Sequence, residues 1–497
     1  MTYTNPIVLC DYSDPDVIRV GDTYYMTASS FNFLPGLPVL ASRDLVHWSL
    51  ASYACREIPF ARYDEVQNAC GIWAPSIRFH GGKFYIFVAT PDEGIFFTSA
   101  ENPFGEWSAL ECVWKGKGFE DPCPIWDDDG RVFLVHAYVK SRIGFNSKLG
   151  LLELDPVTLL AISDDKVIFD GTKTQPTIEG PKFYKRGGFY YIFAPAGGVT
   201  DGWQAVLRSR KIDGKWEERI VLAQGSSSVN GPHQGAWVES AEENGVGIRD
   251  WFVHFQERGV FGRIVHLQPM KWTEDGWPLM GSAVMTGAEC GEPVSSFEMP
   301  VPLSGNPSAC EFPFRDFQFS ANPKPDYARF DGKSVVLRCV PSSSSLWRMA
   351  NVMTKKIDAE NFDFELVADF SAMDEGSRFG VIFVGNEYKS LEVRRLGDSF
   401  GYAVVESAGG EGDEERDETE KGGTVSGTCS SAVFRVSFRK TGGRSGEACI
   451  SLRCDGGFSF STGKFSVEKG HWVGGRFGFY ASSDGKSGGS HVKVRIG

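Results

Sequence analysis

Five side chains suited to sugar chemistry recur at comparable points of five similar segments. The segments read SDPDVIRV, IWAPSIRFH, FEDPCPIWDDD, TIEGPKFYK and PHQGAWVES, and the side chains are Asp14, Trp73, Asp121, Glu179 and His233. Three of them are carboxyl groups. Glycoside hydrolysis needs a protonated acid beside the leaving oxygen and an ionised carboxylate beyond the anomeric carbon. A third carboxylate raises the pKa of the acid by like-charge repulsion.

The segments that follow these residues predict how they are positioned. Each has a Gly or Asp turn and an aromatic-rich strand: VGDTYYMTAS, HGGKFYIFVAT, DDDGRVFLVHAY, KRGGFYYIFAPAGG and IRDWFVHFQERG. The period of roughly 50–60 residues suits propeller blades. Tandem independent domains are the alternative, but each unit is too small to bury a core alone. In a five-bladed propeller the first strand of each blade lines the axis, so the five side chains are expected to converge there.

Each of these residues also has a plainer interpretation. Asp14 and Asp16 can both cap the SDPD turn, and for Asp16 we favour this role. The acidic run at 127–129 before Gly130 predicts a hairpin turn rather than a calcium loop, because no spaced ligands follow it. His233 is either a core histidine or a ligand to a metal or water at the axis. Trp73 is either core or an aromatic platform for a sugar ring.

Composition limits the classes of partner. The 497 residues are 41% hydrophobic and 13% aromatic, which predicts two or three globular domains. A net charge of −13 argues against nucleic acid or an anionic membrane as the main partner, whereas a neutral sugar is unaffected. The eleven cysteines are scattered and form no CxxC pair, so mostly reduced core thiols are expected. No signal peptide or apolar span is visible, which favours a cytoplasmic protein, or a secreted one if a leader has been removed.

Several motifs, in order over about residues 5–280, resemble glycoside hydrolase family 43, the five-bladed propeller β-xylosidases and α-L-arabinofuranosidases. They begin with NPIVLCDYSDPDVIRVGDTYYMTASSFNFLPGLPVLASRDLVHW and continue with GIWAPSIRFHGGKFYIF, GFEDPCPIWDDDG, TIEGPKFYKRGGFYY and FGRIVHLQPM. The resemblance implies inversion of configuration. It implies Asp14 as the general base, Asp121 as the residue that tunes the pKa and orients the sugar, and Glu179 as the general acid.

The same resemblance implies how substrate is held. Phe33 and Trp73 match positions that wall the terminal-sugar pocket, Arg263 matches a substrate-hydroxyl contact, and His233 matches an axial histidine near a water or calcium ion. No cofactor is required, although a calcium ion near His233 stays open. The expected substrate is a small oligosaccharide derived from xylan or arabinoxylan.

The expected activity is exo-acting β-D-xylosidase, with α-L-arabinofuranosidase as a close second or combined activity. An endo-acting arabinanase would need an open groove and ranks third. A non-catalytic propeller lectin is the rival from another class, but clustered carboxylates are costly without a chemical need. A retaining fructosidase-type propeller is expected to carry a WMNDPNG-like motif, which this sequence lacks.

The chain is expected to be all-β. We assign residues 1–285 to the propeller, 286–312 to a Pro-, Ser- and Gly-rich linker and 313–497 to a β-sandwich of the jelly-roll type. No catalytic constellation is visible in the sandwich, so it either binds polysaccharide or braces the pocket, and bracing is favoured.

Overall fold

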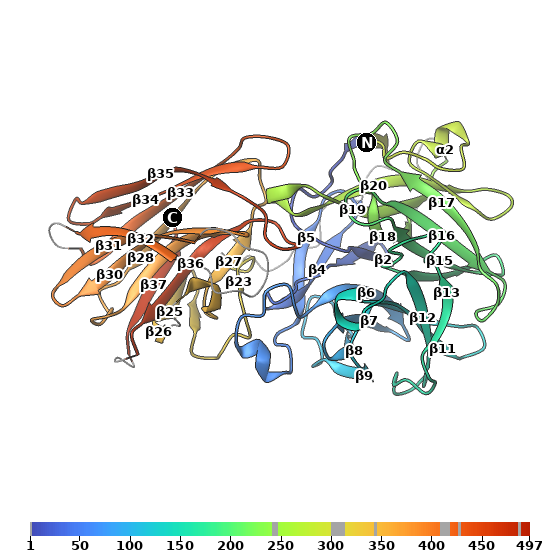
Figure 1. Cartoon of the computed structure of the whole chain (residues 1–497), viewed down its shortest axis with the longest axis horizontal. Helices are drawn as coiled ribbons and strands as arrows, with labels where there is room; N and C mark the ends of the chain where they lie inside the picture. Colours follow the sequence, from blue (N-terminus) through green and yellow to red (C-terminus); the bar gives the residue numbers. More distant parts are fainter. Residues whose placement is uncertain are drawn as a thin grey trace.

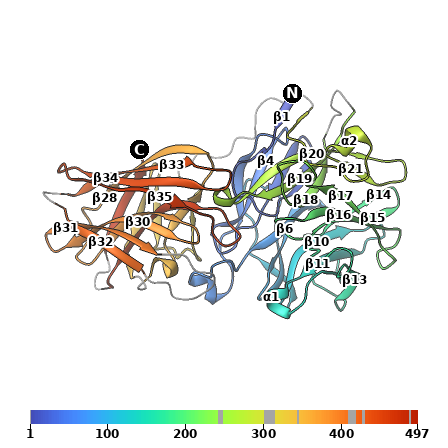
Figure 2. The same cartoon turned by 45° about the horizontal axis from the view of Figure 1, so that its top comes forward.

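The computed structural model has two lobes side by side, a propeller and a sandwich (Figure 1). It describes residues 2–240, 247–299, 314–341, 345–407, 418–425, 429–485 and 489–497. The propeller occupies the N-terminal part of the chain and the sandwich the C-terminal part, and a rotated view keeps the two lobes distinct (Figure 2). The predicted all-β class, with a five-bladed propeller followed by a sandwich, is confirmed.

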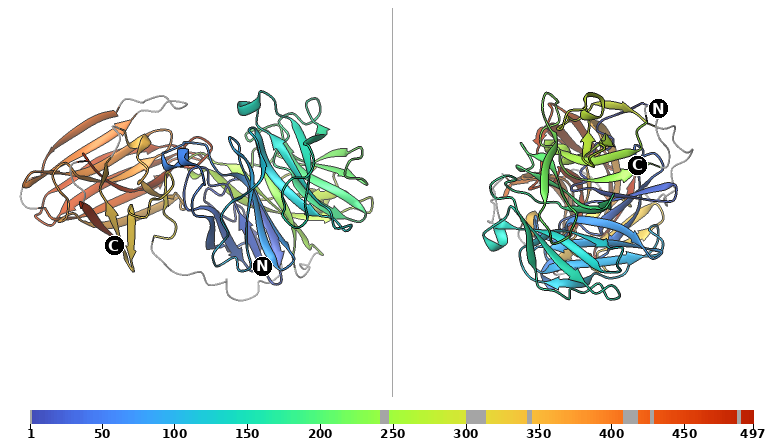
Figure 3. Two further views of the ribbon diagram at one scale, coloured as in Figure 1. Left: turned by 90° about the horizontal axis from the view of Figure 1, so that it is seen from below. Right: turned by 90° about the vertical axis from the view of Figure 1, so that its right-hand side faces the viewer.

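Each propeller blade is a four-stranded antiparallel sheet made of consecutive strands, and the end-on view shows the blades grouped around one centre (Figure 3). Within the described residues, blade 1 consists of β2 (Asp16–Val20), β3 (Thr23–Thr27), β4 (Gly36–Ser42) and β5 (Ser49–Cys55), and blade 2 of β6 (Trp73–His80), β7 (Lys83–Thr90), β8 (Gly94–Ala100) and β9 (Glu111–Lys115). Blade 3 consists of β10 (Phe119–Trp126), β11 (Val132–Tyr138), β12 (Lys148–Leu154) and β13 (Lys166–Asp170), and blade 4 of β14 (Lys182–Arg186), β15 (Phe189–Ala196), β16 (Trp203–Ser209) and β17 (Glu217–Ala223). Blade 5 consists of β18 (His233–Glu239), β19 (Asp250–Glu257), β20 (Arg263–Trp272) and β21 (Pro278–Met280).

The sandwich is built from two large sheets that enclose one apolar core. One sheet runs β23 (Gln318–Phe319), β27 (Met353–Lys356), β36 (Arg476–Ser483), β29 (Arg378–Val384), β30 (Tyr388–Leu396), β31 (Ser399–Ser407) and β32 (Glu418–Thr424), with β26 (Val340–Pro341) parallel to β36. The other runs β24 (Ala328–Asp331), β25 (Ser334–Arg338), β37 (His491–Ile496), β28 (Asn361–Asp369), β33 (Ser431–Lys440), β34 (Gly446–Cys454) and β35 (Ser459–Val467).

Short helices occupy connections. They are η1 (Ala61–Asp64), α1 (Lys140–Ile143), η2 (Gly259–Phe261), α2 (Ala283–Thr286) and η3 (Leu346–Arg348). The acidic run at 127–129 forms the hairpin turn that was predicted, since the Gly130 N–H donates to the Asp127 carbonyl between β10 and β11.

A left-handed residue stands at or near the start of every inner strand. The backbone φ is +57° at Asp14, +33° at Ala74, +58° at Asp121, +57° at Gly180 and +37° at Gln234. Only Gly180 adopts this region without steric cost, and non-glycine residues there cost on the order of 1–3 kcal/mol each. The same strained turn therefore recurs in each blade, next to the residues that the sequence placed on the axis.

Below these turns, buried hydrogen bonds connect neighbouring inner strands. Asp16 on β2 accepts from the Ile77 N–H and from Arg78 Nη1 of β6, both at 2.7 Å. Arg78 Nη2 lies 2.7 Å from Cys123 Sγ of β10, which also accepts from the Phe183 N–H of β14 at 3.2 Å. The prediction that Asp16 caps the SDPD turn is wrong: the side chain is fully buried and holds two blades together.

Two further bonds complete this circle. The Tyr184 hydroxyl on β14 accepts from the Trp237 N–H of β18 at 3.1 Å, and Arg19 Nε on β2 donates to the Glu239 carbonyl of β18 at 2.9 Å. Every inner strand is thus tied to both neighbours, which fixes the register in which the five strained turns face one another.

The N-terminal segment closes the propeller. β1 (Thr2–Thr4) pairs with β22 (Ser296–Glu298), and the Tyr3 hydroxyl donates to the Leu267 carbonyl of β20 at 2.7 Å. Residues 286–299 of the expected linker therefore run back along the propeller, whereas 300–312 lie outside the described residues.

The sandwich packs directly on the propeller. Val260, Phe261 and Ile264, which lead into and begin β20, belong to the apolar core of the sandwich. Glu257 of the propeller forms ion pairs with Arg444 and Lys469 of the sandwich. The last turn before Arg263 is therefore built by both domains.

The cysteines are mostly free thiols, as expected, but only half of the free ones are core residues. Cys429 and Cys454 form a disulfide in the sandwich. Of the eight free cysteines described, four are buried, two half-buried and two exposed. No helix in the described ranges is long and apolar enough to cross a bilayer.

The buried Asp16–Arg78 pair should dominate propeller stability. Asp16→Ala leaves the Arg78 guanidinium, 13% exposed, without its carboxylate, so the free energy of unfolding should fall by about 3–5 kcal/mol. Asp22→Ala is the matched control, because its pair with Arg43 is exposed and should cost less than about 1 kcal/mol. Urea unfolding of both variants measures the difference. Equal small losses of stability in the two variants would contradict a structural role for the circle of hydrogen bonds between the inner strands.

Candidate active site

Asp14 is buried and held by two donors. Arg263 Nη1 lies 3.0 Å from Oδ1, and the Ser29 hydroxyl donates to Oδ2 at 2.5 Å. Ser29 in turn accepts from the Ala74 N–H at 2.7 Å, which couples blade 1 to the strained turn of blade 2. The Arg263 guanidinium packs over the Phe255 ring at 4.8 Å. This environment stabilises a negative charge on Asp14.

The other two predicted carboxylates belong to adjacent blades and are joined through one turn. The Gly180 N–H, beside Glu179, donates to Asp121 Oδ2 at 2.6 Å. Glu179 Oε1 lies 2.8 Å from His233 Nε2 of the next blade. The Glu179 side chain is 28% exposed, against 6% for Asp14, so Glu179 is the more accessible carboxyl.

These carboxyls repel one another. Burial first, then the charges of Glu179 and Asp14, raise the pKa of Asp121 to about 8. Glu120, which the sequence reading overlooked, is affected in the same way: burial and then the charges of Asp121, Glu179 and Asp14 raise its pKa well above the ordinary value. This cluster of carboxyl groups therefore retains at least one proton near neutral pH, which an acid catalyst requires.

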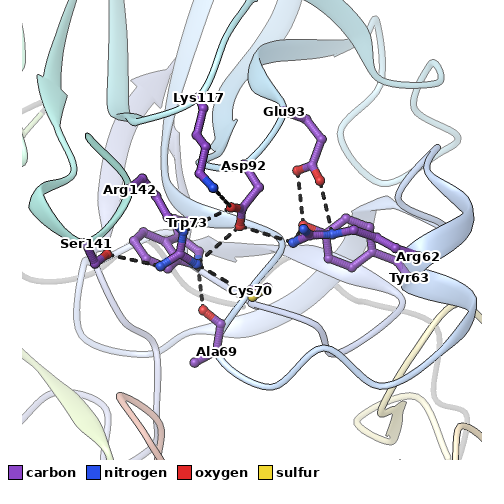
Figure 4. A network of polar contacts seen from close by, with 10 residues as sticks. All are labelled: Arg62, Tyr63, Ala69, Cys70, Trp73, Asp92, Glu93, Lys117, Ser141 and Arg142. Carbon is purple, nitrogen blue, oxygen red and sulfur yellow. Dashed lines mark hydrogen bonds and ion pairs between the residues drawn. The ribbon is translucent and has the colours of Figure 1, made fainter. Parts of the chain in front are cut away.

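Trp73 is positioned by a polar network (Figure 4). Its indole N–H donates to the Ala69 carbonyl at 3.2 Å, and the Arg142 guanidinium lies 5.4 Å from its ring centre. Arg142 makes two bonds to Asp92, at 3.1 and 3.2 Å, and Lys117 pairs with the same carboxylate at 3.6 Å. Burial alone would raise the pKa of Asp92, but the hydrogen bonds and charge of Arg142, followed by those of Arg62, lower it below the ordinary value.

The aromatic rings beside Trp73 come from both domains. Phe31 lies 6.4 Å from the Trp73 ring, and Trp472 of the sandwich lies 4.9 Å from it, edge to face. Phe33 instead packs on the Arg476 guanidinium, at 4.0 Å, and lines a cavity between the domains. Trp472 belongs to the other domain and is far in sequence from the three carboxylates, so no motif pointed to it.

His233 and Arg263 contact catalytic candidates rather than open space. His233 is fully buried and touches Glu179, and Arg263 is 9% exposed and touches Asp14. Both therefore act, in this structure, on the position and charge of a carboxylate.

Asp11, which the sequence reading did not single out, joins the sandwich to this arrangement. Its Oδ1 accepts from the Arg263 N–H at 2.9 Å and its Oδ2 from the Gly474 N–H of the sandwich at 3.0 Å. A Cβ at Gly262 would lie 2.4 Å from the Asp11 carboxyl carbon, and Gly262 has φ +70°. Glycine is required here because the backbone turns tightly against Asp11.

The calcium ion expected near His233 can be compared with the side chains found there. Calcium takes six to eight oxygen ligands, whereas His233 presents a ring nitrogen to Glu179 and a second, buried nitrogen without a partner. Among the described residues, no group of three or more His, Cys, Asp or Glu side chains could hold a metal ion. A calcium ion near His233 stays a prediction, and the chemistry below uses side chains alone.

The fold and site define a class. A five-bladed propeller with carboxyl groups from three blades at its axis, one ion-paired and one accessible, is built as a glycosidase is built. Residues 3–278 match the family model of glycosyl hydrolases family 43, and residues 314–495 match that of the β-xylosidase C-terminal concanavalin A-like domain. The chain belongs to glycosyl hydrolase family 43, as its motifs predicted.

Relatives support this placement. A putative β-xylosidase of Xylanibacter ruminicola is 44% identical over 306 residues, covering 61% of this chain and 55% of the relative. A non-reducing end α-L-arabinofuranosidase of Bacteroides ovatus is 33% identical over 297 residues, covering 56% and 54%. The chain thus spans about half the length of these curated relatives. The solved xylan β-1,4-xylosidase of Bacillus halodurans shares the fold over 99% of both chains, with a TM-score of 0.79 and 20% identity.

The raised pKa of Asp121 predicts a pH-dependent stability. The ordinary pKa is 3.8, so the unfolded chain ionises above about pH 4 while the folded protein stays protonated up to about pH 8. The contribution of this group to stability is therefore fully present below pH 4 and is lost as the pH rises to about 8. Asp121→Asn, which keeps an acceptor for Gly180, should become more stable than wild type by at least about 1 kcal/mol over that range.

Unfolding free energies at pH 4, 6 and 8 measure this effect. Asp128→Asn is the control, because Asp128 is 86% exposed and its substitution should leave the pH profile unchanged. Parallel profiles for wild type and Asp121→Asn would show that the axial carboxyls do not repel one another as described.

Proposed function

We propose that the protein is an exo-acting, inverting glycosidase that releases terminal pentose from xylan- or arabinoxylan-derived oligosaccharides. Its main activity is β-D-xylosidase, with α-L-arabinofuranosidase activity beside it. The observation that carries the proposal is the contrast between Asp14, which is buried and paired with Arg263, and Glu179, which is accessible and lies in the cluster that retains a proton. Two carboxyls in such different environments suit a base and an acid.

The proposed reaction uses these groups in one step. Asp14 accepts a proton from a water molecule, and the water oxygen attacks the anomeric carbon. Glu179 donates its proton to the glycosidic oxygen, so the bond to the leaving group breaks as the new C–O bond forms on the opposite face. Asp121 and its neighbours keep a proton available in the cluster, and His233 and Arg263 hold the acid and the base in place.

A main activity on α-L-arabinofuranosides is the second candidate. It is favoured by the name of the Bacteroides ovatus relative and by the similar hydroxyl layout of the two pentoses. A sugar-binding propeller without catalysis is disfavoured, because burying several mutually repelling carboxyls is costly when no proton transfer depends on them.

The test compares kcat/KM on p-nitrophenyl β-D-xylopyranoside, p-nitrophenyl α-L-arabinofuranoside and xylobiose. Glu179→Ala should lose at least about a hundredfold on xylobiose but less on the aryl glycosides, because nitrophenolate leaves without a proton. Asp14→Ala should lose at least about a hundredfold on all three, unless an external nucleophile such as azide replaces the activated water.

Glu111→Ala, an exposed carboxylate of β9, is the control and should stay within about twofold of wild type. A higher kcat/KM on the arabinofuranoside than on the xylopyranoside would make α-L-arabinofuranosidase the main activity. Absence of turnover on every pentoside, or equal losses in both catalytic variants with every leaving group, would overturn the proposed roles.

A further inference from the structure

Two consecutive carboxyl groups, Glu120 and Asp121, stand near the start of the inner strand of blade 3. Neighbouring residues of a regular strand point to opposite faces of its sheet. Here β10 carries one extra residue, because Glu120 pairs with Ala137 while Cys123, three positions on, pairs with Val135. Asp121 lies inside this bulge and has a φ of +58°. A bulge re-aims the side chains around it, so both carboxyls can face the same group.

The packing on either side of the bulge shows where Glu120 points. Phe119 packs in the apolar core that blade 3 shares with blade 2. Cys123 and Ile125 pack in the core that blade 3 shares with blade 4. Glu120 follows Phe119 directly and, across the bulge, is in phase with Cys123 and Ile125. Its side chain therefore lies on the side of blade 4, the blade that carries Glu179.

Glu120 is within electrostatic reach of the groups assigned to the reaction. Burial first, and then the charges of Asp121, Glu179 and Asp14, raise its pKa well above the ordinary value. The residue is nonetheless only half-buried, so part of it is open to solvent. Glu120 thus borders the space into which a sugar must fit when these carboxyls act on it.

Glu120 differs from the other three carboxyls because it has no donor of its own. Each of the others accepts a hydrogen bond from, or pairs with, a group of a neighbouring blade. The part of the chain that the structure describes provides neither a hydrogen bond nor an ion pair to the Glu120 side chain. Arg142, whose charge lowers the pKa of Glu120, directs its hydrogen bonds to Asp92, Ser141 and Cys70. The Glu120 oxygens are therefore available to a ligand.

We propose that Glu120 is a substrate-binding residue whose carboxyl group hydrogen-bonds a hydroxyl group of the terminal pentose. This inference rests on the proposed function and deepens it, because it adds a contact to the sugar in the same site. A protonated carboxyl group both donates and accepts hydrogen bonds, as a sugar hydroxyl does. The neutral form also adds no negative charge beside Asp14 and Glu179, so it suits a site that must keep one carboxylate and one acid.

The experiment compares Glu120→Ala with Glu120→Gln on p-nitrophenyl β-D-xylopyranoside and xylobiose. Both are assayed at mildly acidic pH, where the raised pKa keeps Glu120 protonated. Glutamine keeps a donor and an acceptor in nearly the same shape, so its KM should stay within about threefold of wild type. Alanine removes the contact, so KM should rise about tenfold on both substrates with a smaller change in kcat.

A role in proton affinity alone gives a different pattern, because alanine and glutamine remove the titrating group equally. Equal changes in the two variants, with equal shifts of the pH–rate profile, would overturn the contact. A loss confined to xylobiose would also overturn it, since Glu120 would then lie beside the leaving group, and so would unchanged kinetics in both variants. Glu111→Gln, at an exposed glutamate of β9, is the matched control and should leave every rate unchanged.

Calorimetric binding of D-xylose and L-arabinose separates this inference from the proposed function. Weaker binding by Glu120→Ala than by Glu120→Gln supports the contact even without turnover, and equal binding by the two overturns it. Absence of turnover on every pentoside by the wild-type protein would instead overturn the proposed function. Urea unfolding checks the fold, because Glu120→Gln removes a carboxyl that its neighbours repel and should be at least as stable as wild type at neutral pH.

Discussion

Electrostatic repulsion among carboxyl groups at the propeller axis is the constraint on which the rest of this structure depends. Asp14, Asp121 and Glu179 come from three blades, and burial together with their mutual repulsion opposes ionisation at Asp121. The fold must therefore hold these groups together against a cost. It does so with a strained turn at each inner strand and with a circle of buried hydrogen bonds beneath the turns.

Cationic groups offset part of that cost. Arg263 pairs with Asp14, and the buried Lys182 ammonium donates to the Pro75 carbonyl near the same turns, where its charge lowers the pKa of Asp121. Arg263 is in turn fixed by Asp11, which also binds Gly474 of the sandwich. The second domain thus contributes to the position of the proposed catalytic base, which favours the bracing role expected for it.

Much of this arrangement could be predicted from sequence, because it repeats. Five turn-and-strand units with the same spacing indicated the propeller, and the polar residue in each unit indicated the axis. The equivalence of the inner strands predicts that Asp14, Asp121 and Glu179 lie in one cluster. The role of Asp16 could not be read in this way, since a buried partner such as Arg78 leaves no mark in the SDPD motif.

The contacts between domains were also beyond prediction. Trp472 lies in a domain without repeats or motifs, and only tertiary packing brings it to the wall that Phe31 and Trp73 form. The family resemblance implied Phe33 as a pocket wall, which stays a prediction, and the ring that meets Trp73 in the structure is Phe31, two residues away. In an extended strand, residues two apart point to the same side, but here Phe31 has a φ of +52° and the Phe33 N–H donates to the Ser30 carbonyl, so the segment turns and the motif alone does not decide which ring faces Trp73.

The central claim is that Asp14 activates water on the face opposite the leaving group that Glu179 protonates. Proton NMR of the first-formed sugar during cleavage of a β-D-xyloside tests it most directly. The account predicts that α-xylose appears first and that the β anomer grows only later, by mutarotation. Initial formation of β-xylose would show retention, and Asp14 would then have to be a nucleophile rather than a base.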